Sequence, residues 1–251
     1  KGTLYEGTIA DFLPFSGERF EAKNNKKSDD KSEIRKIVKL LKDLKTVDME
    51  ALERHVDLDK FMNFWIGEMM LGHWDGYVGH RNNFFFYVNP KSEKVEFIPW
   101  GTDGTFGKHL FVQEKYKIAH GLGRLPAALY SNAVYRQKYL KRVEVMMSDW
   151  WDTEELLADV KEASDLVRPH IHLPENTFDE ALAELREYIK GVPAQITDEL
   201  RRAPDRWPIA LPEDRSPVKN KAPTWAGTVK GDFLIPYGHY GFDQFTDAGK
   251  G

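Results

Sequence analysis

The sequence predicts an α+β protein, a mostly helical chain with a β-hairpin near its centre. Apolar residues recur at helical spacing through much of 30–71 and 126–202. Between these regions, residues 83–88 and 94–99 are rich in aromatic and β-branched residues and flank an Asn89-Pro90 turn, which is the pattern of a hairpin. With 251 residues, of which 41% are hydrophobic, the chain can bury a substantial core.

The N-terminal part is predicted to hold short strands followed by a lysine-rich helix. Residues 1–23 contain small apolar patches separated by glycine and proline, which favours turns with one or two short strands. A helix is then expected to begin near Ser28 or Asp30. Its outer face would carry Lys36, Lys39, Lys42 and Lys45. These lysines form either a phosphate-binding stripe or a solvated face, and the second interpretation is the commoner one for an amphipathic helix.

A buried helix is expected to lead into the hairpin. Residues 49–55 are predicted to form a short helix, and Asp57 can cap the next one, which runs to about Leu71. That second helix is apolar nearly all round, so we expect it to be buried. Gly72 ends it. A polar loop over 72–82, the hairpin, and a glycine-rich loop over 100–107 follow.

The C-terminal part is predicted to be helical to residue 202. Pro169 is expected to end one helix, and two further helices are predicted over 178–190 and 193–202. From Ala203 onward prolines are frequent and the composition changes. We therefore predict two regions, a main domain over 1–203 and a Pro-rich linker with a tail of short β-strands over 204–251.

Composition excludes several classes of function. A net charge of −4 argues against nucleic acid as a partner, and no apolar run approaches the ~20 residues of a transmembrane segment. The absence of cysteine excludes disulfides, zinc–thiolate sites and thiol nucleophiles. No Gly-x-Ser-x-Gly nucleophile motif is present. The chain shows no signal peptide and starts at Lys1 rather than methionine, so we expect a processed product or a fragment.

Two acids and two asparagines lie just after the buried helix and at the two ends of the hairpin. Asp75 follows the helix, Asn82 and Asn83 open the first strand, and Asp103 follows the second strand. A hairpin brings its ends together, so we expect Asn82, Asn83 and Asp103 to lie close in space, with Asp75 nearby. Phosphoryl transfer uses one carboxylate to orient the attacking hydroxyl, and a second carboxylate with an amide oxygen to hold Mg²⁺.

The same residues allow other interpretations. Asp and Asn beside glycines are ordinary turn residues. Asp75 and Asp103 would also serve as the paired acids of a glycosidase, although the neighbouring asparagines fit a metal site better. A zinc or other transition-metal site is a further alternative, but no His-Glu-x-x-His or similar pairing supports it. Its ligands would come from His73, Asp75, His80, Asp103 and His109.

The segment His-Trp-Asp-Gly-Tyr-Val-Gly-His-Arg-Asn-Asn over 73–83, with Pro-Trp-Gly-Thr-Asp-Gly-Thr-Phe-Gly over 99–107, resembles the CotH family of atypical protein kinases. The resemblance covers about residues 3–202 and includes 4–7, 20–23, 57–61 and 139–142. It implies a diverged, two-lobed protein-kinase-like fold with a mostly helical C-terminal lobe and the hairpin at the active site. ATP and Mg²⁺ or Mn²⁺ would bind between the lobes.

The resemblance also implies roles for single residues. By position, Asp75 matches the family's catalytic aspartate. Asn82 and Asn83 match its paired asparagines, and Asp103 matches the second acid of its Trp-Asp-x-Asp motif, so these three are assigned to the metal. Trp100 matches the tryptophan of that motif and is assigned to the nucleotide. Lys23 is the basic residue expected near the phosphates, with an ordinary surface lysine as the alternative.

Two departures from the family pattern leave two functions open. Gly101 stands where the family has the first aspartate of its motif, which would weaken magnesium binding, and most of the nucleotide-binding lobe is expected before Leu4. The resemblance implies a kinase that uses ATP to phosphorylate Ser or Thr of a coat or surface protein, in a spore coat, at a cell surface or after secretion. The alternative is a pseudokinase that serves as a structural coat, surface or adhesion module.

Overall fold

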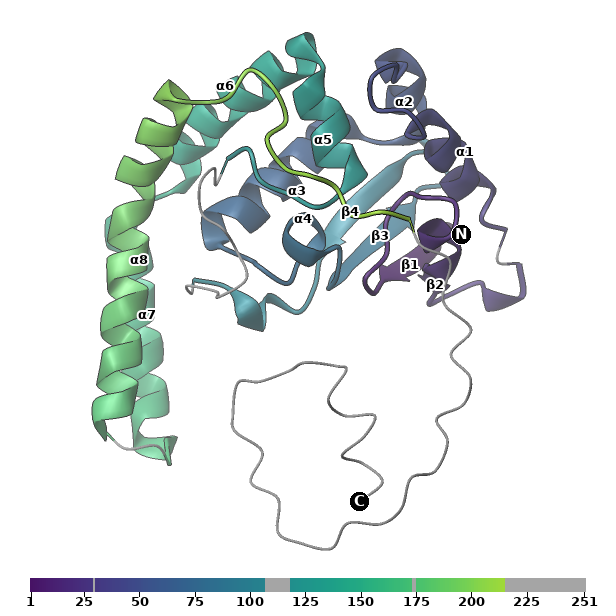
Figure 1. The fold of residues 1–251 in the computed structure, drawn as a ribbon. Helices are drawn as coiled ribbons and strands as arrows, with labels where there is room; N and C mark the ends of the chain where they lie inside the picture. The colour runs from purple at the N-terminus through teal and green to yellow at the C-terminus, as the bar shows by residue number, and fades with distance from the viewer. Residues whose placement is uncertain (29, 107–117, 173–174, 215–251) are drawn as a thin grey trace, which may run out of the picture. The chain divides into compact units, whose positions relative to one another are not determined.

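The computed structural model describes residues 1–28, 30–106, 118–172 and 175–214 (Figure 1). The chain up to Asp214 forms one compact unit. In the described part the architecture is mixed, with many helices and one small antiparallel sheet, as predicted. The tail strands expected beyond residue 214 lie outside the described residues, as do Gly107 and His109.

A four-stranded antiparallel sheet supports the candidate site. Its strands are β1 (Thr3–Gly7), β2 (Glu21–Ala22), β3 (Phe84–Val88) and β4 (Val95–Pro99), in the order β2-β1-β3-β4. Pairing of β3 with β4 confirms the predicted hairpin. Pairing of β3 with β1 was not predicted, because the period of a strand pattern shows which face is buried and not which distant strand lies beside it.

Alternation along the strands separates an inner face from an outer one. Tyr5 and Phe97 lie on either side of Phe86 on the inner face, and Phe86 is fully buried. Rings from the segment between β1 and β2, from α3 (Leu58–Leu71) and from α4 (Tyr77–His80) complete this aromatic cluster. They belong to Phe12, Phe20, Phe61, Phe64 and Tyr77. Phe85 and Ile98 are paired on the outer face, which is therefore not wholly polar.

The helices follow in the predicted order, with some differences in extent. They are η1 (Ser16–Arg19), η2 (Lys26–Ser28), α1 (Ser32–Leu40), α2 (Met49–His55), α3 (Leu58–Leu71), α4 (Tyr77–His80), η3 (Thr102–Gly104), α5 (Arg124–Ser131), α6 (Ala133–Trp150), α7 (Thr153–Val167), η4 (Arg168–His170) and α8 (Glu175–Arg201). α1 begins at Ser32, where the Asp30 carboxylate accepts a hydrogen bond from the Ser32 N–H at 2.7 Å and holds the preceding backbone in a turn. α4 was not predicted, because a single turn carries no detectable periodicity.

α3 leads directly into the loop that carries Asp75. Asp57 Oδ1 accepts from the Lys60 N–H at 3.1 Å, which confirms the predicted N-cap. Trp65 is fully buried, and its ring stacks on that of Tyr139 in α6 with centroids 3.8 Å apart. Gly72 ends the helix in the left-handed conformation, with φ 65°. The loop that follows therefore starts from a rigid, buried support.

α7 and α8 pack side by side as a helical hairpin (Figure 1). α7 ends before Pro169, as predicted. The predicted break before Pro193 is wrong, because α8 continues through it. Val192 and Ile196 are buried on either side of this proline, and their packing offsets the cost of ~3 kcal/mol that a proline imposes inside a helix. No helix in the described ranges is both long and apolar enough to cross a lipid bilayer.

Residues 204–214 pack on the main unit, although the linker was predicted to start at 204. The Tyr130 hydroxyl donates to the C=O of Pro204 at 2.8 Å. The Trp207 ring meets that of Tyr130 at 5.7 Å between centroids. The Asp214 carboxylate accepts from the backbone N–H of Phe15 at 2.9 Å. The compact unit consequently ends at Asp214 rather than near Ala203.

Candidate active site

Asp75 lies in the loop between α3 and α4, where both neighbouring asparagines hold it. Its Oδ2 accepts hydrogen bonds from Nδ2 of Asn82 at 3.1 Å and from Nδ2 of Asn83 at 2.7 Å. All three side chains are partly buried. The other carboxylate oxygen, Oδ1, has no partner among the described residues. The structure thus brings Asp75, Asn82 and Asn83 together and orients one carboxylate with two amides.

The two asparagines are engaged differently. Asn82 Oδ1 accepts from the Ile9 N–H at 3.3 Å, which ties the loop after β1 to the site. Asn83 has a left-handed backbone, with φ 44°, which asparagine tolerates better than most residues. Its Oδ1 has no partner in the described part of the chain. Of the two amide oxygens, the one on Asn83 is therefore the one without a partner among the described residues.

Backbone strain gathers around this loop. Six described residues other than glycine have positive φ, and four of them are Ile9, Arg81, Asn83 and Phe106. Ile9 tolerates this conformation least, because its Cβ is branched. Residues of this kind persist only where the surrounding structure holds them, and they cluster at functional sites. The strain therefore supports a functional role for this part of the molecule.

Gly101 lies against Asn83, which explains why the position carries no side chain. Its φ is 59°, and a Cβ built there would lie 2.9 Å from Cγ of Asn83. The Trp100 N–H donates to the C=O of Asn83 at 3.2 Å, so the end of β4 is fixed against the start of β3. An aspartate at position 101 would need a strained backbone and a displaced Asn83 side chain.

Asp103 lies in η3, the turn after β4. Its carboxylate is exposed and has no hydrogen bond or ion pair among the described residues. The backbone on either side lies close to the Asp75 loop, and Gly101 is hydrogen-bonded to it. His73 Nε2 donates to the C=O of Gly101 at 3.1 Å, and a Cβ on Gly104 would lie 2.9 Å from the Trp74 indole nitrogen. Asp103 thus lies beside the Asp75 loop, but its side chain is not held in one orientation.

The outer face of the sheet presents apolar residues next to this turn. Trp100 is 54% exposed, and its ring meets that of Phe85 edge-on, with centroids 5.2 Å apart. Ile98, which pairs with Phe85, is exposed as well. Three apolar side chains therefore form a patch at the end of β4.

Lys23 follows β2 on the same sheet and is already paired. Its ammonium forms ion pairs with Glu6 and with Glu21, the latter at 2.9 Å. These carboxylates, Glu6 foremost, raise the pKa of Lys23. Because two acids neutralise its charge, Lys23 would have to leave them to contact the phosphates of a nucleotide.

A buried acid that the sequence analysis did not single out lies beneath the Asp75 loop. Glu68 of α3 accepts from the N–H of Tyr77 at 3.2 Å and from the N–H of Val78 at 2.8 Å, so it caps α4. His73 Nδ1 lies 3.5 Å from Glu68 Oε1. Burial raises the pKa of Glu68, while His73 and the two N–H groups oppose this shift. The available signal was a glutamate inside a helix that is otherwise apolar nearly all round.

A second buried acid, Asp11, supports the other side of α4. Its carboxylate accepts from the N–H groups of Phe12 at 2.8 Å and Arg124 at 2.9 Å, and from the Tyr77 hydroxyl at 2.9 Å. Burial raises the pKa of Asp11, and burial together with the Asp11 carboxylate raises the pKa of Tyr77 well above its usual range. Asp11 was missed because it lies in an irregular segment without periodicity.

The described residues do not form the alternative transition-metal site. No three His, Cys, Asp or Glu side chains in these ranges gather in a way that would hold a metal ion. His73 faces Glu68 and the Gly101 carbonyl, and His80 Nδ1 contacts the Trp74 carbonyl at 3.0 Å. The fifth candidate, His109, lies outside the described residues.

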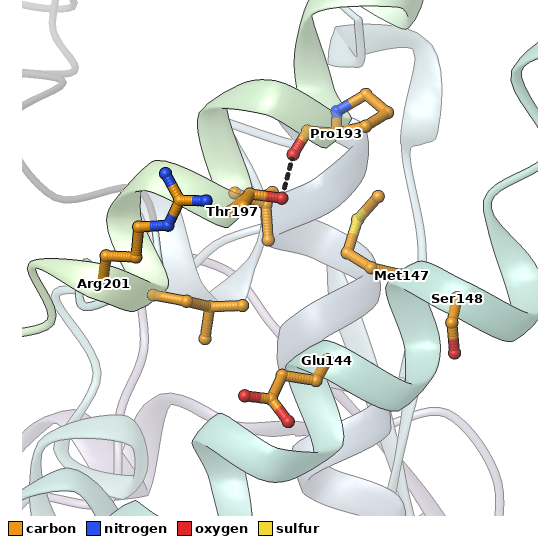
Figure 2. Close-up of a pocket in the computed structure, with 8 residues that line it drawn as sticks. Glu144, Met147, Ser148, Pro193, Thr197 and Arg201 are labelled. Carbon is orange, nitrogen blue, oxygen red and sulfur yellow. Dashed lines mark hydrogen bonds between the residues drawn. The ribbon is translucent and has the colours of Figure 1, made fainter.

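A separate hollow lies between α6 and α8 (Figure 2). Its volume is about 550 Å³, and Met147 and Pro193 are among its apolar walls. Glu144 and Arg201 lie at its polar rim. None of the predicted site residues lines it. The candidate active site is therefore the surface around Asp75 and Asp103, not this hollow.

Comparison with known proteins identifies relatives of the whole region that carries this site. A family model described as CotH kinase protein matches residues 11–202. Inner spore coat protein H of Bacillus subtilis (strain 168) is 23% identical over 156 residues. That alignment covers 59% of this chain and 42% of the relative, so the chain spans less than half the length of that protein.

Proposed function

The chain belongs to the CotH kinase protein family, and from that membership we propose that it is an ATP-dependent protein kinase. It transfers the terminal phosphoryl group of ATP to a serine or threonine hydroxyl of a partner protein. Asp75 orients that hydroxyl or accepts its proton, and Asp103 with Asn83 holds the divalent ion. In this proposal the unit that ends at Asp214 is the carboxylate-bearing lobe of a two-lobed, kinase-like fold.

The observation that carries the proposal is the orientation of Asp75. Two amide N–H groups fix one carboxylate oxygen and leave the other without a partner among the described residues. A carboxylate held in this way can receive a hydroxyl without first losing side-chain freedom. A positioned general base of this kind typically contributes about 10²–10⁴-fold to a rate.

The available donors fit a hard divalent cation. Asp103 offers an exposed carboxylate, and Asn83 offers an amide oxygen that has no partner among the described residues. Mg²⁺ and Mn²⁺ prefer such oxygen ligands. Asn82 fits less well, because its Oδ1 already accepts from Ile9. When bound, the ion would neutralise charge on the transferred phosphoryl group. Gly101 adds no ligand, so we expect weaker metal binding than at a site with two carboxylates.

The apolar patch at the end of β4 supports an assignment of Trp100 to the nucleotide. Aromatic faces pair well with a flat purine base, and Trp100 lies directly before the turn that carries Asp103. Lys23 remains a candidate for the phosphates only in a state that breaks its ion pairs with Glu6 and Glu21. The nucleotide contacts of this chain therefore rest on Trp100 more than on Lys23.

The name of the relative supports a partner and a location. Because that protein is an inner spore coat protein, we propose a coat or surface protein as the substrate. The corresponding location is a spore coat or a cell surface.

Gly101 favours a second function, that of a pseudokinase serving as a structural coat, surface or adhesion module. The position lacks the acid that the family motif has, and Asn83 fills the space where a side chain would begin. A chain that binds ATP without transferring its phosphoryl group would fit this function.

Incubation of the full chain with radiolabelled ATP, Mg²⁺ or Mn²⁺ and candidate coat proteins tests the two functions. A kinase should label a partner protein or itself, and Asp75→Asn and Asp103→Ala should abolish the label. Asp159→Asn removes an exposed acid on α7 and should leave labelling unchanged. ATP binding without label in any condition would reject the kinase and support the pseudokinase. No ATP binding at all would reject nucleotide chemistry altogether.

A further inference from the structure

We infer that Glu68 and His73 are positioning residues, a buried ion pair that holds the Asp75 loop and the Asp103 turn at a fixed separation. Neither belongs to the proposed catalytic or metal-binding set. Their effect on phosphoryl transfer rests on the proposed function, whereas the ion pair and the link between the two segments do not. The pair and the link follow from the contacts of these two side chains alone.

Glu68 connects α3 to the first turn of α4. Its side chain is 2% exposed, and each carboxylate oxygen accepts one backbone N–H, Oε1 from Tyr77 and Oε2 from Val78. Two such bonds stabilise the ionised carboxylate at the N-terminus of a helix. α4 begins directly after Asp75 and Gly76, so Glu68 determines where the chain leaves the Asp75 loop.

His73 connects Glu68 to the Asp103 turn. Its Nε2 lies 3.1 Å from the carbonyl oxygen of Gly101, which can only accept, so Nε2 carries a proton. Its Nδ1 is buried, and Glu68 Oε1 lies 3.5 Å from it, an ion-pair distance longer than a well-formed hydrogen bond. A second proton on Nδ1 satisfies both contacts at once, because a bare nitrogen lone pair facing a carboxylate would be repelled.

The charges around His73 favour this doubly protonated form. Burial lowers the pKa of His73, but Glu68, the Gly101 carbonyl and Asp75 together raise it above its ordinary value. Glu68 comes from α3, Asp75 from the same loop as His73, and Gly101 from the segment before η3. The three groups that oppose the effect of burial thus come from three segments, and each of them favours the positive charge of the ring.

Gly76 leaves the space in which the pair meets. A Cβ at Gly76 would lie 2.4 Å from Glu68 Oε1 and 2.6 Å from His73 Nδ1. Contacts this short do not occur, so any larger residue would push the two groups apart. The chain therefore joins α3, α4 and the Asp103 turn through one buried contact, and Asp75 lies between the points that it fixes.

Histidine-selective ¹⁵N NMR of the full chain tests the ion pair without any activity. Both ring nitrogens of His73 should show protonated shifts at neutral pH, and Glu68→Gln should remove the Nδ1 proton. Hydrogen–deuterium exchange then tests the link. In His73→Phe, amide exchange over 101–105 and at Tyr77 and Val78 should accelerate about 10- to 100-fold, as expected when a charged hydrogen-bonded group is lost.

The chain offers a matched control. His55 Nδ1 lies 3.0 Å from Glu33 Oε2, a partly exposed pair of the same chemistry between α2 and α1. His55→Phe should leave exchange in both site segments unchanged. If Asp75 acts as proposed, Glu68→Gln and His73→Phe should lower kcat more than they raise the KM for ATP.

The outcomes separate this inference from the proposed function. A single protonated nitrogen on His73 at neutral pH, or unchanged exchange over 101–105 in His73→Phe, would overturn the inference even in an active kinase. Protonated nitrogens with accelerated exchange support it even if the chain transfers no phosphate. In that case the proposed function fails and the link between the two segments stands.

Discussion

The side chains of the two acids in the candidate site are constrained to very different degrees. Asp75 is partly buried and two amides fix one of its oxygens, whereas Asp103 is exposed and has no partner among the described residues. The backbone before Asp103 is nevertheless hydrogen-bonded to His73 through the Gly101 carbonyl, and Gly104 lies close to the Trp74 ring. The structure therefore sets the orientation of one carboxylate in advance and sets only the location of the other. The kinase proposal depends on this difference, because it gives Asp75 the proton-accepting role and Asp103 the metal-binding role.

The largest expected effect is on phosphoryl transfer, and the two acids should differ in their effect on Mg²⁺-dependent ATP binding. Asp75→Asn should lower phosphoryl transfer by about 10²–10⁴-fold, as expected for loss of a general base. Asp103→Asn should also lower it, through loss of a metal ligand. Asp75→Asn should leave the Mg²⁺ dependence of ATP binding unchanged, because no ion ligand is lost. Asp103→Asn should weaken it. Single-turnover transfer and calorimetric titration of ATP at several Mg²⁺ concentrations measure both quantities. An equal loss of Mg²⁺ dependence in the two variants would contradict the assignment of only Asp103 to the ion.

The next effect concerns the backbone that places Asp103. Gly101→Ala should destabilise the protein by about 1–2 kcal/mol, because a Cβ is unfavourable at φ 59° and meets Asn83. A Cβ added at Gly191 in α8 would meet no other part of the described chain within 4 Å, so Gly191→Ala should stabilise by about 0.5–1 kcal/mol. Urea unfolding measures both changes.

The same geometry sets an expectation for Gly101→Asp. The added carboxylate should not restore strong metal binding, because it displaces Asn83. Asn83 is one of the two amides that hold Asp75, and its oxygen has no partner among the described residues. A gain of Mg²⁺ affinity in Gly101→Asp without loss of stability would show that Asn83 can move aside freely.

Much of the fold followed from local patterns. The hairpin, α2, α3 and the cap at Asp57 were predictable because turn residues, apolar periodicity and capping chemistry act over a few neighbours. The pairing of β1 with β3 depends on contacts between distant segments. Pro193 likewise remains helical because both flanks pack on the rest of the unit, an effect that no local rule contains.

The candidate site, like the fold, was predictable where it depends on local sequence patterns. Asp75, Asn82 and Asn83 follow from motif and topology, and the structure joins them by hydrogen bonds. Which amide oxygen has no partner among the described residues was not predictable, because the Asn82 oxygen accepts from Ile9, a residue from another part of the chain. The pairing of Lys23 with two acids was not predictable from the sequence either, since it depends on strand register.

A smaller effect should distinguish the two asparagines. Asn82→Ala removes bonds to Ile9 and Asp75 and should cost about 1 kcal/mol of stability. Asn83→Gly keeps the left-handed backbone accessible while removing the amide, and should cost a similar amount. Only Asn83→Gly should weaken Mg²⁺-dependent ATP binding. Equal weakening in Asn82→Ala, measured by the same titration, would indicate that Asn82 also binds the ion.

The smallest expected effect lies in how stability depends on pH, where His73 and His120 should act in opposite directions. Burial, and then His80, lower the pKa of His120 below its ordinary 6.5. The unfolded chain therefore gains that proton first, and stability falls as pH drops below 6.5. The pKa of His73 is raised, so its contribution is complete below 6.5 and is lost as pH rises through the folded value. Glu68, whose pKa is also raised, acts in the same direction as His73.

Calorimetric Tm curves between about pH 5 and 9 test these signs. His120→Asn should flatten the acid limb, because the residue that must gain a proton on unfolding is gone. His73→Asn should flatten the alkaline limb, and the exposed His170→Asn should change neither. If His73→Asn instead altered only the acid limb, the ring would be neutral in the folded protein. The contact that separates the two acid-bearing segments would then be a packing contact and not an ion pair.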